Sequence, residues 1–216
     1  MKFDYRTENI GNWVIRYRKP NREGFFPAYL FLHGWTGDEN SMWVFESRIP
    51  DDAYLISLRG LYPTPLGGYG WQSSGEDKWP TLIDFQPAIN SISEIIELKN
   101  FPQCDFSNLT LVGYSQGASL AYGFGIVHPE RVCAIAALSG FLPKNIELSM
   151  EKYSLEGLPI YITHGSLDEL VPVEKARTAV DFLSRAGANV SYCEEPVGHK
   201  LSTACFNGME TFFNYQ

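Results

Sequence analysis

The residue of this chain whose setting most favours chemistry is a serine between two glycines. Ser115 lies in the stretch 113–117 (Gly-Tyr-Ser-Gln-Gly), after an aliphatic run at 109–112 and before a helical pattern over 116–128. A strand followed at once by a helix makes a tight turn, and glycines without Cβ atoms let the two elements approach closely. The serine hydroxyl would then project from the sheet as a nucleophile. The alternative is a glycine-rich turn with an incidental serine.

A serine hydroxyl needs a base that removes its proton and a carboxylate that orients the base. The chain has four histidines. His33 and His164 each end an apolar run before a glycine, where an imidazole commonly shapes a turn, and His128 ends a predicted helix. His199 follows the expected last strand, 190–194, and precedes a C-terminal helix. The pattern therefore predicts His199 as the base.

The orienting carboxylate is predicted to be Asp168. It follows the apolar strand 158–163 directly, and its intervals to Ser115 and His199 each leave room for a helix and a strand. Three other acids could compete: Glu169, Glu194 and Glu195. The turn that holds Asp168 favours this residue over the three.

An acyl-transfer site also needs N–H groups that bind the developing oxyanion. The N–H of Gln116 opens the predicted helix, where the helix dipole adds to its effect. A second donor is expected in a loop after an early strand, and Trp35 follows the apolar run 28–32, with Gly34 allowing close approach. The alternative for Gly34 is a plain glycine turn.

Several apolar runs are typical of strands buried on both faces of a parallel sheet, namely 28–32, 54–58, 131–138 and 158–163. Residues 12–18 alternate loosely and predict an edge strand. Helical periodicity appears near 87–99 and around 176–183. Strands that alternate with helices indicate an α/β fold with a mostly parallel central sheet and helices on both faces. No repeat or linker divides the chain, so one domain over residues 1–216 is predicted.

Composition excludes several classes of protein. The net charge is −8 and the lysines and arginines are scattered, which argues against a nucleic-acid partner. No stretch approaches the roughly 18 apolar residues of a membrane span, and the first residues are too charged for a signal peptide. A cytoplasmic protein is expected. The four cysteines form no C-x-x-C pair, and Cys133 and Cys193 lie in predicted strands, so neither zinc nor a disulfide framework is expected.

Residues 60–80 form a long segment rich in glycine and aromatic residues. Long loops in compact domains are often functional, and this loop follows a strand whose end faces the serine in a parallel sheet. Tyr69 and Trp71 are the predicted substrate-binding residues, as an apolar lining for the acyl group. The alternatives are a surface loop packed for stability and a homodimer contact.

Four stretches together resemble the phospholipase/carboxylesterase family of α/β-hydrolases, which includes carboxylesterases and acyl-protein thioesterases. They are 32–39 (Leu-His-Gly-Trp-Thr-Gly-Asp-Glu), 113–118 (Gly-Tyr-Ser-Gln-Gly-Ala), 137–143 (Ala-Leu-Ser-Gly-Phe-Leu-Pro), and 164–172 with Gly198-His199. The resemblance implies the α/β-hydrolase fold, a triad of Ser115, Asp168 and His199, oxyanion N–H groups of Trp35 and Gln116, and no cofactor or metal.

The expected function is therefore hydrolysis of small-molecule carboxylic esters through an acyl-serine. A thioesterase acting on acyl thioesters is the alternative, since the family covers both kinds of ester. A peptidase and a non-catalytic ligand-binding protein are the other two candidates. One departure concerns the acyl site: family members often carry Trp, an aromatic residue and an acid where this chain has Trp71-Gln72-Ser73.

Overall fold

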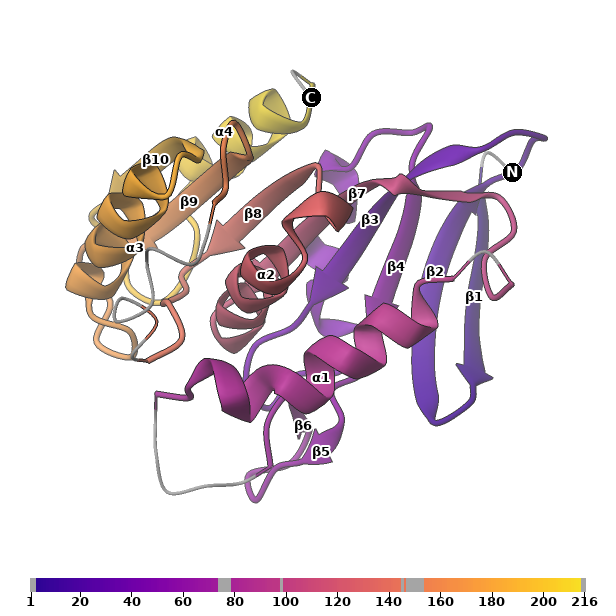
Figure 1. Ribbon diagram of the computed structural model, residues 1–216, viewed down its shortest axis with the longest axis horizontal. Helices are drawn as coiled ribbons and strands as arrows, with labels where there is room; N and C mark the ends of the chain where they lie inside the picture. Colours follow the sequence, from indigo (N-terminus) through magenta and orange to yellow (C-terminus); the bar gives the residue numbers. More distant parts are fainter. Residues whose placement is uncertain (1–2, 74–78, 98, 145, 147–153, 215–216) are drawn as a thin grey trace.

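The structure is a computed structural model that describes residues 3–73, 79–97, 99–144, 146 and 154–214. An eight-stranded sheet runs through it in the order β1-β2-β4-β3-β7-β8-β9-β10 (Figure 1). β1 pairs with β2 and β2 with β4 in antiparallel fashion, and all other pairs are parallel. The strands are β1 (Phe3–Ile10), β2 (Trp13–Pro20), β3 (Phe26–Leu32), β4 (Tyr54–Leu58), β7 (Cys104–Tyr114), β8 (Ala134–Leu138), β9 (Pro159–Gly165) and β10 (Asn189–Glu195).

Helices cover both faces of this sheet. α1 (Leu82–Ile95), α2 (Gln116–Val127) and α3 (Val173–Arg185) lie on one face, in front of the strands in Figure 1. The 3₁₀ helix η1 (Ser41–Arg48) and α4 (Thr203–Asn214) pack on the other. A short second sheet pairs β5 (Tyr62–Pro63) with β6 (Tyr69–Gly70), and a 3₁₀ turn η2 spans Pro129–Arg131. The mostly parallel sheet with helices on both faces is the predicted architecture.

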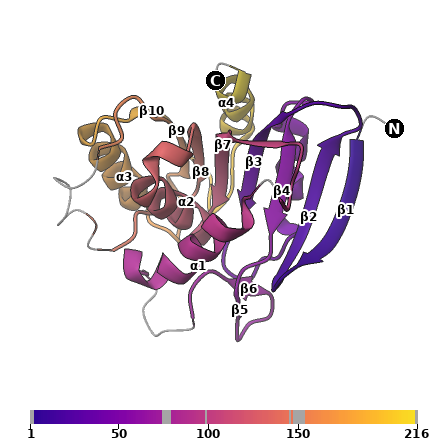
Figure 2. The same ribbon diagram turned by 45° about the vertical axis from the view of Figure 1, so that its right-hand side comes forward.

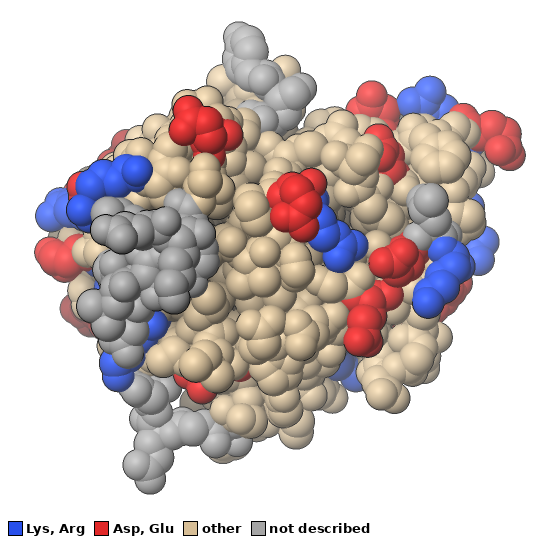
Figure 3. Space-filling view, in the orientation of Figure 1, with Lys and Arg blue, Asp and Glu red and all other residues tan. Residues whose placement is uncertain are grey.

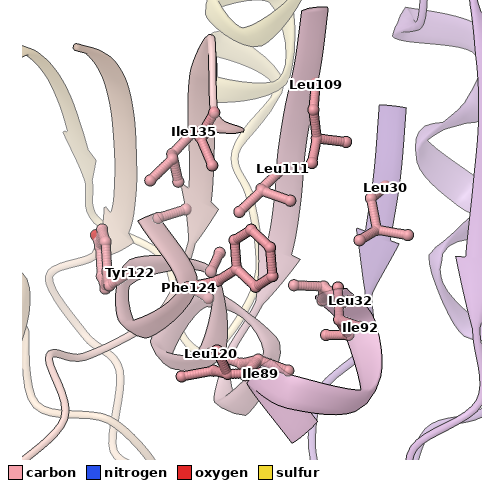
Figure 4. Packing of buried hydrophobic residues seen from close by; sticks show 14 of the residues in the cluster. Leu30, Leu32, Ile89, Ile92, Leu109, Leu111, Leu120, Tyr122, Phe124 and Ile135 are labelled. Carbon is pink, nitrogen blue, oxygen red and sulfur yellow. The ribbon is translucent and has the colours of Figure 1, made fainter. Parts of the chain in front are cut away.

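The sheet has a hydrophobic core on each face, because side chains along a strand point alternately to one face and the other. Leu30 and Leu32 of β3 point to the α1–α3 face, while Tyr29 and Phe31 point to the η1–α4 face. Figure 4 shows the first core, where strand residues meet Ile89 and Ile92 of α1 and Leu120, Tyr122 and Phe124 of α2. These runs are apolar at every position because both faces of the strand are buried.

Some predicted boundaries and neighbours are wrong. β2 is not the edge strand, because β1 pairs along its whole length and takes the edge, which Figure 2 shows clearly. The sequence of β1 is polar, since an edge strand needs few buried positions, and it lacks an alternating signal. α1 begins at Leu82 instead of near residue 87, because Thr81 and Asp84 form a capping box. Residues 131–133 precede β8 and are not part of it.

The expectation for the cysteines is also wrong. Cys193 of β10 and Cys205 of α4 form a disulfide, and Cys133 is exposed and not a buried hydrophobe. Sequence spacing could not predict this bond, because the two cysteines meet only when α4 packs back on β10. Disulfides persist mainly in oxidising compartments. The cytoplasmic location therefore stays a prediction, and the bond is an observation against it.

On the face drawn in Figure 3, the described lysines and arginines form no large basic region and lie among acidic side chains. Among the described residues, no helix has the length and apolar character needed to cross a bilayer. The single-domain and homodimer hypotheses stay predictions.

Candidate active site

Ser115 lies at a strained corner between β7 and α2. Its φ is 53° and its ψ is −115°, a conformation that is costly for any residue with a side chain. The corner is possible because both flanking positions are glycine: a Cβ on Gly113 would collide with the carbonyl of Gly117, and one on Gly117 with the carbonyl of Leu32. The N–H of Ser115 donates to the carbonyl of Leu138 at 2.8 Å. The predicted strand–turn–helix is present.

The structure brings Asp168 and His199 into contact. Asp168 Oδ1 accepts the backbone N–H groups of Leu170 and Val171, both at 2.9 Å, which fixes the carboxylate within its turn. Asp168 Oδ2 lies 2.6 Å from His199 Nδ1, and the carboxylate is fully buried. Because an ionised carboxylate only accepts hydrogen bonds, this contact requires a proton on Nδ1. In the tautomer that carries its single proton there, Nε2 of His199 keeps the lone pair that a general base requires.

Backbone contacts hold the two loops that carry Asp168 and His199. Leu167 N–H donates to the carbonyl of Val197 at 3.0 Å, and the absence of a Cβ on Gly165 lets the loop 197–198 lie directly against it. The hydroxyl of Tyr114 donates to the carbonyl of His199 at 2.7 Å. Tyr114 is thus a positioning residue that sequence reasoning missed, although it stands next to Ser115.

The competing acids do not reach His199. Glu169 is exposed, and the carboxylate of Glu194 accepts two hydrogen bonds from Arg177, at 3.0 and 2.7 Å. Glu195 has no side-chain contact with His199 among the described residues. Asp168 is therefore the acid that contacts the imidazole.

The N–H groups of Trp35 and Gln116 are both without a partner among the residues that the structure describes. Gln116 is the first residue of α2, and Trp35 follows β3 at the same edge of the sheet. In the described part of the chain, neither N–H donates a hydrogen bond to another protein group. Free N–H groups at a helix start can bind an anion, because the helix dipole is positive there. Both donors are available for an oxyanion.

The segment that presents Trp35 is held from behind by His33 and Trp71. Nε2 of His33 accepts the N–H of Gly60 at 2.8 Å, so Nδ1 carries the proton and donates to the carbonyl of Gly34 at 2.7 Å. The indole N–H of Trp71 donates to the carbonyl of His33 at 2.7 Å. Burial lowers the pKa of His33, which favours the neutral ring that this pair of bonds requires.

His164 lies on the other side of Asp168. Its Nε2 donates to the carbonyl of Val171 at 2.7 Å and lies 3.4 Å from Asp168 Oδ2. Burial lowers the pKa of His164, so this ring is also neutral. Both His33 and His164 shape turns and satisfy buried polar groups, in agreement with the sequence-based interpretation. Neither His33 nor His164 lines the cavity that contains Ser115.

Ser115, Gln116 and His199 line one cavity of about 580 Å³, here called the Ser115 cavity. No hydrogen bond joins the side chains of Ser115 and His199 among the described residues. Such contacts are often long in enzymes without substrate. The rest of the lining is mostly apolar and includes Leu66, Trp79, Phe141, Leu170 and Val171. The rings of Trp79 and Phe141 meet edge to face with centroids 4.8 Å apart.

The predicted acyl-binding residues Tyr69 and Trp71 do not line this cavity. Trp71 is completely buried, because its indole packs on His33 and donates to the carbonyl of that residue. The ring of Tyr69 lies under the guanidinium of Arg59, 4.8 Å from its centroid. The loop 60–80 does reach the cavity, through Leu66, Gln72 and Trp79. Its composition indicated a functional loop but could not tell which aromatic side chain turns inward.

No group of three or more His, Cys, Asp or Glu side chains in the described ranges has the arrangement of a metal site. The chemistry available at this edge of the sheet is that of a serine, an imidazole, a buried carboxylate and two N–H groups without a partner among the described residues.

A model of the family described as phospholipase/carboxylesterase matches residues 26–216. The chain belongs to this family. Acyl-protein thioesterase 1 of Saccharomyces cerevisiae is 25% identical over 171 residues, which cover 71% of this chain and 75% of the yeast protein. Probable carboxylesterase SOBER1-like of Arabidopsis thaliana is 25% identical over 181 residues, which cover 80% of this chain and 66% of the plant protein.

The chain spans between 34% and 66% of the length of three curated relatives that it matches, including the Arabidopsis protein. Among solved structures, a carboxylesterase from Mesorhizobium loti superposes with a TM-score of 0.82 at 21% identity, covering 98% of this chain and 99% of that protein. Together with family membership, this superposition confirms the α/β-hydrolase fold.

Proposed function

We propose that the protein hydrolyses carboxylic esters of small molecules through an acyl-serine intermediate. The observation that carries the proposal is the contact of 2.6 Å between Asp168 Oδ2 and His199 Nδ1, beside Ser115 in one cavity. It is supported by family membership and by relatives named carboxylesterase and acyl-protein thioesterase.

In the proposed reaction, His199 Nε2 takes the proton of Ser115 while Oγ attacks the ester carbonyl. The oxygen of the tetrahedral intermediate accepts hydrogen bonds from the N–H groups of Trp35 and Gln116. The bond from carbon to the leaving oxygen breaks, and His199 passes its proton to that oxygen. Water, activated by the same imidazole, then hydrolyses the acyl-serine. Asp168 holds the ring in the tautomer that both steps need.

Thioester hydrolysis is the second candidate, because a relative that matches 71% of the chain is named acyl-protein thioesterase 1. The same residues would act, with sulfur as the leaving atom. Rates for matched oxygen and sulfur esters of one acid decide between the two. A non-catalytic binding role is disfavoured because the serine, the imidazole and the carboxylate are all present together.

The experiment is labelling with a fluorophosphonate, which reacts only with an activated serine. Ser115→Ala should abolish labelling and lower ester turnover by at least about 10³-fold. Ser139→Ala is the matched control, since Ser139 also has a positive φ, 50°, but its buried hydroxyl has no hydrogen-bond partner among the described residues. Labelling that persisted in Ser115→Ala would falsify the assignment of the nucleophile.

A further inference from the structure

A second cavity lies next to the Ser115 cavity, on the side of η1 and α4. Its volume is about 510 Å³, which is within the range of small-molecule sites. Its apolar lining comes from η1 and from the residues around the start of α4, and we call it the η1–α4 pocket; these residues are Met42, Val44, Phe45, Leu201 and Phe206.

The two cavities share part of their lining, which is the predicted oxyanion segment together with Tyr114. Gly34, Trp35, Thr36 and Tyr114 line both of them. Trp35 carries a free N–H, and Tyr114 directly precedes Ser115. Ser115 itself lines only the Ser115 cavity, so the η1–α4 pocket adjoins the site of the reacting carbonyl through this shared lining.

A tetrahedral carbon on Ser115 Oγ has three further substituents: the oxyanion, the acyl chain and the leaving group. The N–H groups of Trp35 and Gln116 take the oxyanion. The acyl chain and the leaving group point away from each other, so each needs its own space. Two adjacent cavities that share the lining around the Trp35 N–H group offer those two spaces.

The position of His199 decides which substituent enters which cavity. When the bond from carbon to the leaving oxygen breaks, that oxygen takes the proton from His199, so the leaving group begins beside this imidazole. His199 itself lines the Ser115 cavity, and the next two residues of the chain, Lys200 and Leu201, line the η1–α4 pocket. The acyl chain is left with the Ser115 cavity, between Trp79, Phe141 and Leu66.

We propose that the η1–α4 pocket binds the leaving alcohol or thiol of the substrate, as an uncharged aryl or branched alkyl group. The apolar side chains favour such a group, and Lys200 disfavours a cationic one. The proposal rests on the proposed function and adds to it the class of alcohol or thiol that the enzyme releases.

Esters that share one acyl group test the proposal, because they form the same acyl-serine and differ only in the acylation step. Their kcat/KM values therefore report on the leaving group alone. The first series is methyl, benzyl and naphthylmethyl butyrate. The second series is methyl esters of straight-chain acids of increasing length, which varies only the acyl part.

Three exposed apolar residues allow matched substitutions by tryptophan. Val44 lines the η1–α4 pocket and is 67% exposed, and Leu66 lines the Ser115 cavity and is 84% exposed. Ile83 of α1 is 82% exposed and lines neither cavity, so Ile83→Trp is the control. Because all three side chains already face solvent, tryptophan enters without overpacking a core.

Val44→Trp should lower kcat/KM for the naphthylmethyl ester, relative to the methyl ester, by about 10-fold or more, since a filled apolar pocket rejects the larger group. Val44→Phe should give a smaller change in the same direction. Leu66→Trp should change the dependence of kcat/KM on acyl length and leave its dependence on the alcohol as in the wild type. Ile83→Trp should change neither dependence.

If the ratios of kcat/KM among the methyl, benzyl and naphthylmethyl esters were the same in Val44→Trp as in the wild type, the inference would be overturned. A change in the acyl series of Val44→Trp instead would overturn it too, because the pocket would then hold the acyl chain. Absence of hydrolysis of every ester by the wild type would overturn the proposed function and this inference with it. If the wild type hydrolyses the esters and Val44→Trp leaves the kcat/KM ratios of the alcohol series unchanged, this inference is overturned and the proposed function is not.

Discussion

Asp168 and Glu169 are adjacent acids with very different surroundings, which makes them a matched pair for mutation. Asp168→Asn should lower kcat by about 10⁴-fold, because an amide can donate to His199 Nδ1 and so favour the wrong tautomer. Glu169→Gln, at an exposed position, should have little effect. Kinetics on one ester, with circular dichroism to check folding, measures both. The opposite ranking would transfer the orienting role to Glu169.

Trp79 is the aromatic residue of the loop 60–80 that we expect to contact the acyl chain. It lines the Ser115 cavity and packs edge to face on Phe141. Trp79→Ala should enlarge the acyl side and change the ratio of kcat/KM between long and short acyl esters by about 10-fold. Tyr69→Phe is the control, because Tyr69 lies against Arg59 outside the cavity. An equal shift in both variants would count against a direct contact by Trp79.

At the scale of elements, the disulfide clamps the loop that carries His199. Cys193 in β10 and Cys205 in α4 are 12 residues apart in sequence, and His199 lies between them. Closing a loop of this length restricts the unfolded chain. The double variant Cys193→Ser/Cys205→Ser should therefore lose about 3 kcal/mol of unfolding free energy.

Urea denaturation with and without reductant measures this loss. Reductant should bring the wild type to the level of the double variant and leave the variant unchanged. Cys133→Ser is the control, because Cys133 is an exposed free thiol. If the wild type unfolds at the same urea concentration in both conditions, the bond does not form in solution.

At the scale of the whole molecule, two buried histidines make stability depend on pH. Burial lowers the pKa of His33 and of His164 below the ordinary value of about 6.5. The unfolded chain then binds more protons than the folded one as pH falls below about 6.5, so unfolding becomes easier. Above about pH 6.5 the full stability is present, and each histidine can remove up to about 1.4 kcal/mol per pH unit below it.

Urea midpoints between about pH 8 and about pH 5 measure this dependence. A flat stability profile in the wild type through this range would contradict the assignment of two neutral, buried imidazoles.

The sequence by itself determined the strand–turn–helix at Ser115 and the alternation of buried strands with helices. These features are local: glycines at 113 and 117 permit the strained turn, and continuous apolar runs such as 28–32 predict strands covered on both faces. The order of Ser115, Asp168 and His199 along the chain was also readable, since each follows a predicted strand and parallel strands bring their ends to one edge.

Only the tertiary structure decided which side chains meet. Trp71 lies inward because its indole N–H donates to the carbonyl of His33, and Trp79 lies at the cavity, where its ring packs on Phe141. The polar strand β1 lies at the edge of the sheet because it pairs with β2, and Cys193 bonds to Cys205 because α4 packs against β10. The η1–α4 pocket also combines residues from 34–45 with residues from 200–206. Such contacts depend on the packing of elements far apart in the chain, which local periodicity does not encode.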